Sequence, residues 1–245
     1  NVATGRAGGV AAPLDVLPKG HGVRGVSTYV SADGTIKGQW VKTKAEEQTR
    51  AAVLQHLLES LPAAVPAAPP VPPPDMDHGS DVLAVYPMGD PHIGMLSWGE
   101  ETGEDFDLAR AEALMCGAIE TLVRQGVPAK QALVANLGDF FHADDMDART
   151  RRSGHFLDVD SRWAKVLRVG MRIMVHHIHA ALTAHETVRV ICEVGNHDDH
   201  SAVMLQLGLD AYFREEPRVT VDLSPSRYHW LEFGRCLLGV THGDM

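Results

Sequence analysis

"YPMGDPHIGM", residues 86–95, places Asp90 and His92 two positions apart at the end of an apolar run, with a glycine on each side. That run, "DVLAVY" at 81–86, has the length and composition of a buried strand. Ligands of open α/β sheets bind beyond the carboxyl ends of the strands. The stretch therefore predicts a strand that ends at a polar binding site.

Three later apolar runs end in the same way. The runs cover 132–136, 187–194 and 236–241, and the motifs that follow them are "GDFFH", "GNHDD" and "THGD". Glycine lets the backbone turn sharply and approach a neighbouring group closely. Because parallel strands end at one edge of a sheet, we expect the four motifs to converge on one site.

Helical patterns separate these strands. One helix is expected over 107–125 with Asp107 as its N-cap, and a second over 159–185. Further strands are expected at 218–222 and 228–233. Alternation of strands and helices predicts βαβ units, so residues 81–245 should form an α/β domain around a largely parallel sheet.

The N-terminal part has a different character. Residues 1–60 are expected to form a small basic segment: a β-hairpin around Asp33, followed by a helix over 45–61. The apolar stripe of that helix needs a partner, which is the hairpin, the large domain or a second copy in a homodimer. Seven prolines fall within 61–80, which predicts an extended linker. Residues 1–44 carry a charge of about +4 although the whole chain carries −10.

The residue types at the four strand ends indicate divalent metal binding. Asp, Asn and His offer oxygen and imidazole ligands without a thiolate, which suits Mn and also Fe, Zn or Mg. A central carboxylate can bridge two ions about 3.5 to 4 Å apart, and such a pair activates water and holds a phosphoryl group.

In this order, "GDPHIG", "GDFFH", "GNHD" and "THGD" resemble the calcineurin-like metallophosphoesterase superfamily, which includes nucleases of DNA double-strand-break repair. The stretches "DPHIGMLSWGEETGEDFDL", "LDVDSRW" and "PRVTVDLSPS" look more closely like phosphoesterases of phages and prophages. The resemblance covers about 81–245. It implies a layered αββα sandwich with a two-metal site at the carboxyl ends of the strands.

The resemblance also implies ligand roles. Asp90 and His92 would bind one metal, Asp139 would bridge both, and Asn196 and His242 would bind the other.

Three further residues would act in catalysis. His197 would contact the phosphate and protonate the leaving oxygen, with Asp198 orienting it. His142 resembles a histidine that the nucleases place near the scissile phosphate, although it could be an ordinary loop histidine. The loop "ARTRRSGH" at 148–155 either lies in solvent or contacts a phosphate backbone.

One element of the family pattern is absent. The superfamily motif Gly-His-x-His does not follow His242, since the sequence given stops at Met245. We expect a truncated form of a longer protein. The alternatives are a site completed by another group and a site with impaired activity.

These observations predict a metal-dependent phosphodiesterase, with DNA as the expected substrate. The alternatives are a phosphoesterase for small molecules and a DNA-binding or assembly protein with an impaired site. No apolar stretch is long enough to span a membrane and no secretory signal is recognisable, so we expect a cytoplasmic protein without a membrane partner.

Overall fold

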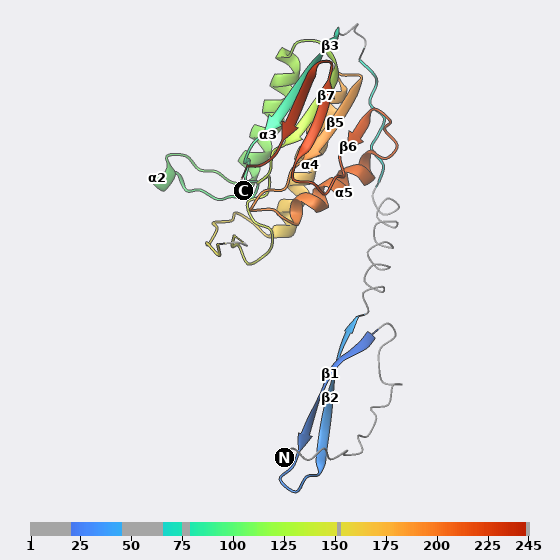
Figure 1. Cartoon of the computed structure of the whole chain (residues 1–245). Helices are drawn as coiled ribbons and strands as arrows, with labels where there is room; N and C mark the ends of the chain where they lie inside the picture. Colours follow the sequence, from blue (N-terminus) through green and yellow to red (C-terminus); the bar gives the residue numbers. More distant parts are fainter. Residues whose placement is uncertain (1–20, 46–65, 75–78, 151–152, 244–245) are drawn as a thin grey trace. The chain divides into compact units, whose positions relative to one another are not determined.

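The structure is a computed structural model that describes residues 21–45, 66–74, 79–150 and 153–243. The chain divides into two compact units, Asn1–Ala63 and Ala64–Met245, which are described separately (Figure 1).

The first unit contains the predicted hairpin. Strands β1 (His21–Val30) and β2 (Ile36–Ala45) pair antiparallel. In the turn between them, the Asp33 carboxylate accepts hydrogen bonds from the Ser31 hydroxyl and the Thr35 N–H. These bonds lower the pKa of Asp33 to about 2, and the bond from Ser31 has the largest effect. The helix predicted over 45–61 lies outside the described residues, except for Ala45, which ends β2.

A parallel sheet forms the centre of the second unit. In the described part of the chain its strands are β3 (Gly79–Met88), β4 (Ala129–Asn136), β5 (Thr187–Cys192) and β6 (Val219–Val221), hydrogen-bonded in that order. The predicted parallel α/β sheet is confirmed. A second sheet within the described residues consists of β7 (His229–Phe233) and β8 (Cys236–Val240), which pair antiparallel.

The helices of this unit are α2 (Gly99–Thr102), α3 (Leu108–Gln125), α4 (Trp163–Leu182) and α5 (Ser201–Phe213). Asp107 caps α3 as predicted, since its carboxylate accepts a hydrogen bond from the Arg110 N–H. The expectation of a helix from residue 159 was wrong at its start. Val159 forms an isolated β-bridge with Met95, and the Asp160 N–H donates to the Gly94 carbonyl. This segment is therefore extended before α4 begins.

Helix α5 was not predicted from the sequence. Its residues "SAVMLQLGLDAYF" are apolar on most sides, so no stripe of helical period stands out. Residues buried on α5 include Leu205, Leu209 and Phe213, which join the main core.

Two clusters of buried side chains lie on opposite faces of the parallel sheet. Because neighbouring residues of a strand point to opposite faces, Ala132 and Val134 pack with the helices, and Leu133 and Ala135 pack with Val240 of β8. The unit is therefore layered, with helices on one face of the parallel sheet and the β7–β8 sheet on the other.

The proline-rich segment differs from the predicted spacer. Residues 66–74 form neither helix nor strand, and they are attached to the rest of the larger unit: the Ala68 N–H donates to the Tyr212 carbonyl over 2.7 Å, and Arg218 donates to the Val71 carbonyl over 2.6 Å. Ala68 and Val71 also pack on the main core. This part of the expected linker is thus bound to the domain that follows it.

None of the helices in the described ranges combines the length and the apolar composition that a membrane crossing requires.

Candidate metal centre

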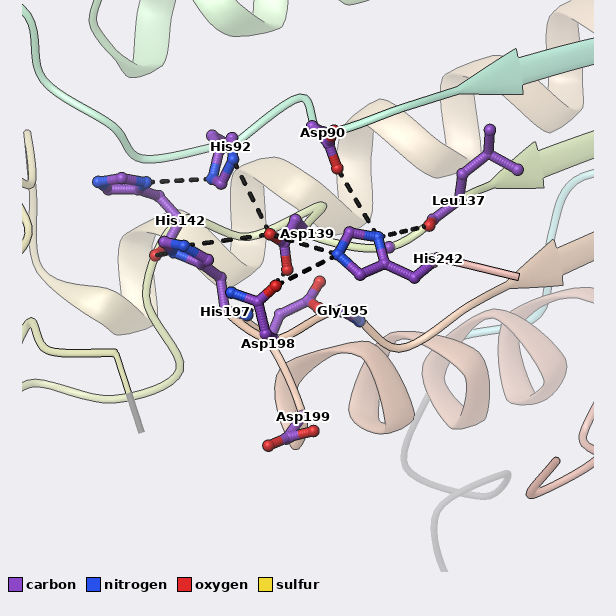
Figure 2. Close-up of polar contacts among 12 residues, drawn as sticks. Asp90, His92, Leu137, Asp139, His142, Gly195, His197, Asp198, Asp199 and His242 are labelled. Atoms are coloured by element: carbon purple, nitrogen blue, oxygen red, sulfur yellow. Dashed lines mark hydrogen bonds and ion pairs between the residues drawn. The ribbon is translucent and has the colours of Figure 1, made fainter. Parts of the chain in front are cut away.

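Loops from four strands meet around the carboxylate of Asp139 (Figure 2). The loop after β3 carries Asp90 and His92, the loop after β4 carries Asp139, and His242 follows β8. The loop after β5 supplies Asn196 and His197. The structure therefore brings together residues that are up to 152 positions apart in the sequence.

Asp139 lies at the centre of three imidazoles. Its Oδ2 atom is 4.0 Å from His92 Nε2, 4.0 Å from His197 Nε2 and 3.6 Å from His242 Nε2. These distances are longer than hydrogen bonds, for which about 2.7 to 3.2 Å is usual. Two donor atoms that share one ion at about 2.1 Å each lie roughly 3 to 4 Å apart, so the spacing suits ligands of a common metal.

The backbone holds His242 in the tautomer that a metal ligand needs. Its Nδ1–H donates to the Leu137 carbonyl over 2.9 Å, which leaves the lone pair on Nε2. Nε2 is 3.4 Å from Asn196 Oδ1 and 3.6 Å from Asp139 Oδ2. Asp90 Oδ1 lies 3.7 Å from the other ring nitrogen of His242.

A second group consists of His92, His142 and His197, whose ring centroids are 4.7 to 5.5 Å apart. His92 Nδ1 and His142 Nδ1 are 3.2 Å apart, and the His197 Nδ1–H donates to the His142 backbone carbonyl over 2.8 Å. Burial is the main cause that lowers the pKa of His142 to about 4, and the nearby His92 and His197 contribute further. Burial and the neighbouring His197 also lower the pKa of His92. At neutral pH, His142 is therefore uncharged and has a nitrogen lone pair available.

Two sets of side chains could hold a metal ion. One consists of Asp90, Asp139 and His242, and the other of His92, His142 and His197. The resemblance assigned Asp90 and His92 to one ion, whereas the donor distances place them in different sets. The donor chemistry fits divalent cations in both sets, since one combines two carboxylates with an imidazole, the other offers three imidazoles, and neither contains a thiolate.

The backbone is strained at three of the expected ligands. Among the described residues other than glycine, the left-handed region is occupied by Asp90, His92, Asp139 and Ala148, with φ between 45° and 49°. Each such residue costs about 1 to 3 kcal/mol, and such strain clusters at functional sites. Strain at three neighbouring ligand positions supports a functional role for this centre.

Two glycines allow the strands to approach one another here. A Cβ atom on Gly195 would clash with the backbone nitrogen and carboxylate of Asp139, and one on Gly138 would clash with the His242 ring. The glycines of "GDFFH" and "GNHDD" are therefore required by the close approach of the loops after β4, β5 and β8.

Asp198 is placed differently from the expected orienting role. Its buried carboxylate accepts hydrogen bonds from the Gly195 N–H at 2.9 Å and the Phe141 N–H at 3.2 Å. The ring of His197 is oriented instead by the backbone carbonyl of His142. Burial, which outweighs these two bonds, raises the pKa of Asp198 to about 6. Through these hydrogen bonds, Asp198 connects the loop that carries Asp139 to the loop that carries His197.

The sequence interpretation missed buried polar residues that hold the elements next to the site in place. Asp144 is buried and accepts hydrogen bonds from the Ser201 N–H and hydroxyl, which fixes the start of α5. Glu193 and His229 are buried next to each other, with 3.1 Å between Oε2 and Nε2. Glu193 stands three residues before Asn196, at the end of an apolar run. A charged residue at such a place is the signal that could have identified it.

Comparison with known proteins gives no match: no family model, no curated protein and no solved structure is similar to this chain.

Proposed function

We propose that the protein is a metal-dependent phosphodiesterase whose reaction takes place at Asp139, with DNA as the substrate. The observation that carries the proposal is the set of three imidazole Nε2 atoms at 3.6 to 4.0 Å around one buried carboxylate. The resemblance of the four strand-end motifs to calcineurin-like metallophosphoesterases supports the same reaction. The layered α/β fold is compatible with the sandwich of that superfamily.

Five residues would hold the metals. Asp139 would be shared, Asp90 and His92 would approach from the β3 loop, and Asn196 and His242 from the loops after β5 and β8. Bound divalent ions, of which Mn suits these ligands, supply a water of lowered pKa and neutralise charge on the phosphoryl oxygens.

His197 is suited to proton transfer. The His142 carbonyl fixes its Nδ1–H, so Nε2 faces the centre 4.0 Å from Asp139. From this position, a protonated Nε2 would donate to the leaving oxygen of a phosphodiester bound at the metals. His142 is uncharged at neutral pH, and its Nδ1 lies next to His92 rather than next to an acid. It would support the ring of His92 and border the bound phosphate.

Cationic side chains outside the centre support nucleic acid as the substrate. Arg149, seven residues after His142, is exposed and lies 3.4 Å above the ring of Phe156. On the hairpin, Lys37 and Lys42 are also exposed. Such groups attract a phosphate backbone regardless of base sequence.

The test uses the full chain, stripped of metal and then loaded with Mn²⁺. The wild type should hydrolyse methyl p-nitrophenyl phosphate and cleave single- or double-stranded DNA. Asp139→Ala should lose bound metal in elemental analysis together with activity, because it removes the shared ligand. Asp210→Ala changes an exposed aspartate of α5 and serves as the control. Unchanged metal content in Asp139→Ala would contradict the proposal.

A further inference from the structure

A cavity of about 510 Å³ lies beside the candidate metal centre. Ile93, which lines it, follows His92 in the chain, and Ala143, which also lines it, follows His142. Consecutive Cα atoms are about 3.8 Å apart, so the cavity begins one residue from two histidines of the centre. A substrate whose phosphate lies at these histidines would have a neighbouring group within reach of the cavity.

The cavity lining suits a flat aromatic ring. Val159 provides apolar surface and the indole of Trp163 provides an aromatic surface, with the buried side chains of Ile93 and Val166 behind them. The indole N–H donates to the Ser201 hydroxyl over 3.3 Å, which holds that ring in place. Apolar pockets of about 300 to 1,000 Å³ with a few polar groups are typical of small-molecule sites.

The polar groups of the cavity can hydrogen-bond to a nucleobase. Asp145 and Asp160 contribute carboxylates, Ser161 contributes a hydroxyl and Arg162 contributes a guanidinium. In each carboxylate, one oxygen accepts a hydrogen bond from the backbone: Asp160 accepts from the Leu108 N–H, and Asp145 accepts from the Asp147 N–H. Carboxylates repel phosphate but accept hydrogen bonds from the amino and ring N–H groups of bases.

Large apolar side chains are exposed on the two loops that border the cavity. Leu96 is 44% and Trp98 60% exposed on the loop after His92, and Met146 is 75% and Phe156 78% exposed on the loop after His142. The two loops are joined by backbone contact, since the Leu96 N–H donates to the Asp158 carbonyl. Exposed apolar surface of this kind marks interaction sites, and stacking on bases is one use of it.

We propose that this cavity binds the nucleobase attached to the phosphodiester under attack. The proposal rests on the proposed function, because it places the scissile phosphate at Asp139 and His197. It narrows the substrate to nucleotide esters, whether at the end of a nucleic acid or in a free dinucleotide.

The test compares substrates that differ by one base. Thymidylyl-thymidine is assayed together with two analogues that lack either the 5′ or the 3′ base, and an analogue that lacks both bases is the substrate without any aromatic ring. The wild type should hydrolyse one of the two abasic analogues at least tenfold more slowly, in kcat/KM, than the dinucleotide. Equal values of kcat/KM for the dinucleotide and the two analogues that lack one base would overturn the proposal.

A cavity-filling variant provides the second arm. Ser161→Phe should lower kcat/KM for the dinucleotide about tenfold and leave kcat/KM for the analogue that lacks both bases within twofold. Ser27→Phe makes the same exchange at an exposed position of the hairpin and should change neither. An equal loss on both substrates in Ser161→Phe would refute a role in base binding.

Binding of thymidine 5′-monophosphate, measured by calorimetry on the full chain, separates this proposal from the proposed function. If methyl p-nitrophenyl phosphate is not hydrolysed, the proposed function fails, and the cavity is then judged by binding alone. Ser161→Phe should weaken that binding about tenfold. Equal affinities in the two proteins would overturn the proposal. A short oligonucleotide that binds at least tenfold more tightly than the mononucleotide would identify a nucleic acid as the source of the base.

Discussion

The buried pair of Glu193 and His229 should be essential for the stability of the larger unit. Glu193 ends the run that leads into the Asn196 loop, and His229 begins β7. Their side chains are 1% and 2% exposed, and 3.1 Å separates Oε2 from Nε2. On the other side of the imidazole, Nδ1 lies 3.6 Å from Asp222, which itself pairs with Arg189 at 2.8 Å.

The perturbation is His229→Gln, which leaves the Glu193 carboxylate buried without its cation. Removing one partner of a buried ion pair costs about 3 to 5 kcal/mol in the free energy of unfolding. For a unit of this size, each kcal/mol corresponds to roughly 2 to 4 °C in Tm, so we expect a loss of about 6 to 20 °C. Glu193→Gln combined with His229→Gln removes both charges and should recover part of this loss.

The pH dependence has a definite sign. Contact with the Glu193 carboxylate raises the pKa of His229 above its usual 6.5. A raised pKa in the folded state means that the stabilisation is fully present below pH about 6.5 and is lost as the pH rises through the folded-state value. The free energy of unfolding of the wild type should therefore decrease with rising pH above about 6.5, and His229→Gln should lack this decrease.

Chemical denaturation of both single variants and the double variant, at pH 6 and at pH 9, measures these effects. The exposed pair of Arg172 and Glu112, which is 2.9 Å long, is the control, because an exposed pair is worth only about 0 to 1 kcal/mol. If His229→Gln is no less stable than Arg172→Gln at pH 6, or if the pH slope is unchanged, the reasoning is wrong.

Three further predictions concern the site and the hairpin. His197 belongs to a histidine set that could hold a metal ion, but its proposed role is proton donation. His197→Ala should therefore keep its metal content in elemental analysis while turnover on phosphodiesters falls by roughly 10² to 10⁴. A loss of metal, or unchanged turnover on a poor leaving group, would contradict the proton-donor role. Gly195→Ala should lose metal binding and about 1 to 3 kcal/mol in denaturation because its Cβ would clash with Asp139. Gly117→Ala, in a helix with open space around it, should instead gain up to about 1 kcal/mol, and equal effects would refute the packing argument. Changing Lys37 and Lys42 together to Ala should reduce the slope of log affinity for DNA against log salt by about 1.8 in a salt titration, whereas an unchanged slope would exclude the hairpin from the phosphate contacts.

The parallel sheet could be predicted because each strand carries its own local signal. The run before Asp139 is apolar on both faces, as a strand that is covered on both faces must be. The run before Asp90 is also apolar, although Val82 and Val85 of this edge strand are exposed. The convergence of the strand ends then follows from topology alone. The start of α4 was misplaced, because a tertiary contact between Val159 and Met95 keeps that segment extended, and such a contact leaves no periodic signal.

The roles of individual site residues were less predictable than their convergence. Asp198 was expected to orient His197, but the His142 carbonyl takes that position. A backbone carbonyl has no signature in the sequence, since every residue carries one. The same holds for the Leu137 carbonyl, which fixes the tautomer of His242. Resemblance between motifs indicates which side chains gather, and only the structure identifies their hydrogen-bond partners.

The distance between Asn196 and His242 depends on how two sheets are held together. Asn196 follows β5 of the parallel sheet, whereas His242 follows β8 of the antiparallel one. The Glu193–His229 pair joins β5 to β7, and the Leu137 carbonyl joins the β4 loop to His242. Apolar packing between the sheets is non-directional, so directional polar contacts such as these two help to set the register of one sheet on the other. A variant that breaks the ion pair should therefore weaken the binding of the metal at Asn196 and His242 more than that of the metal at His92, which lies on the β3 side of the centre.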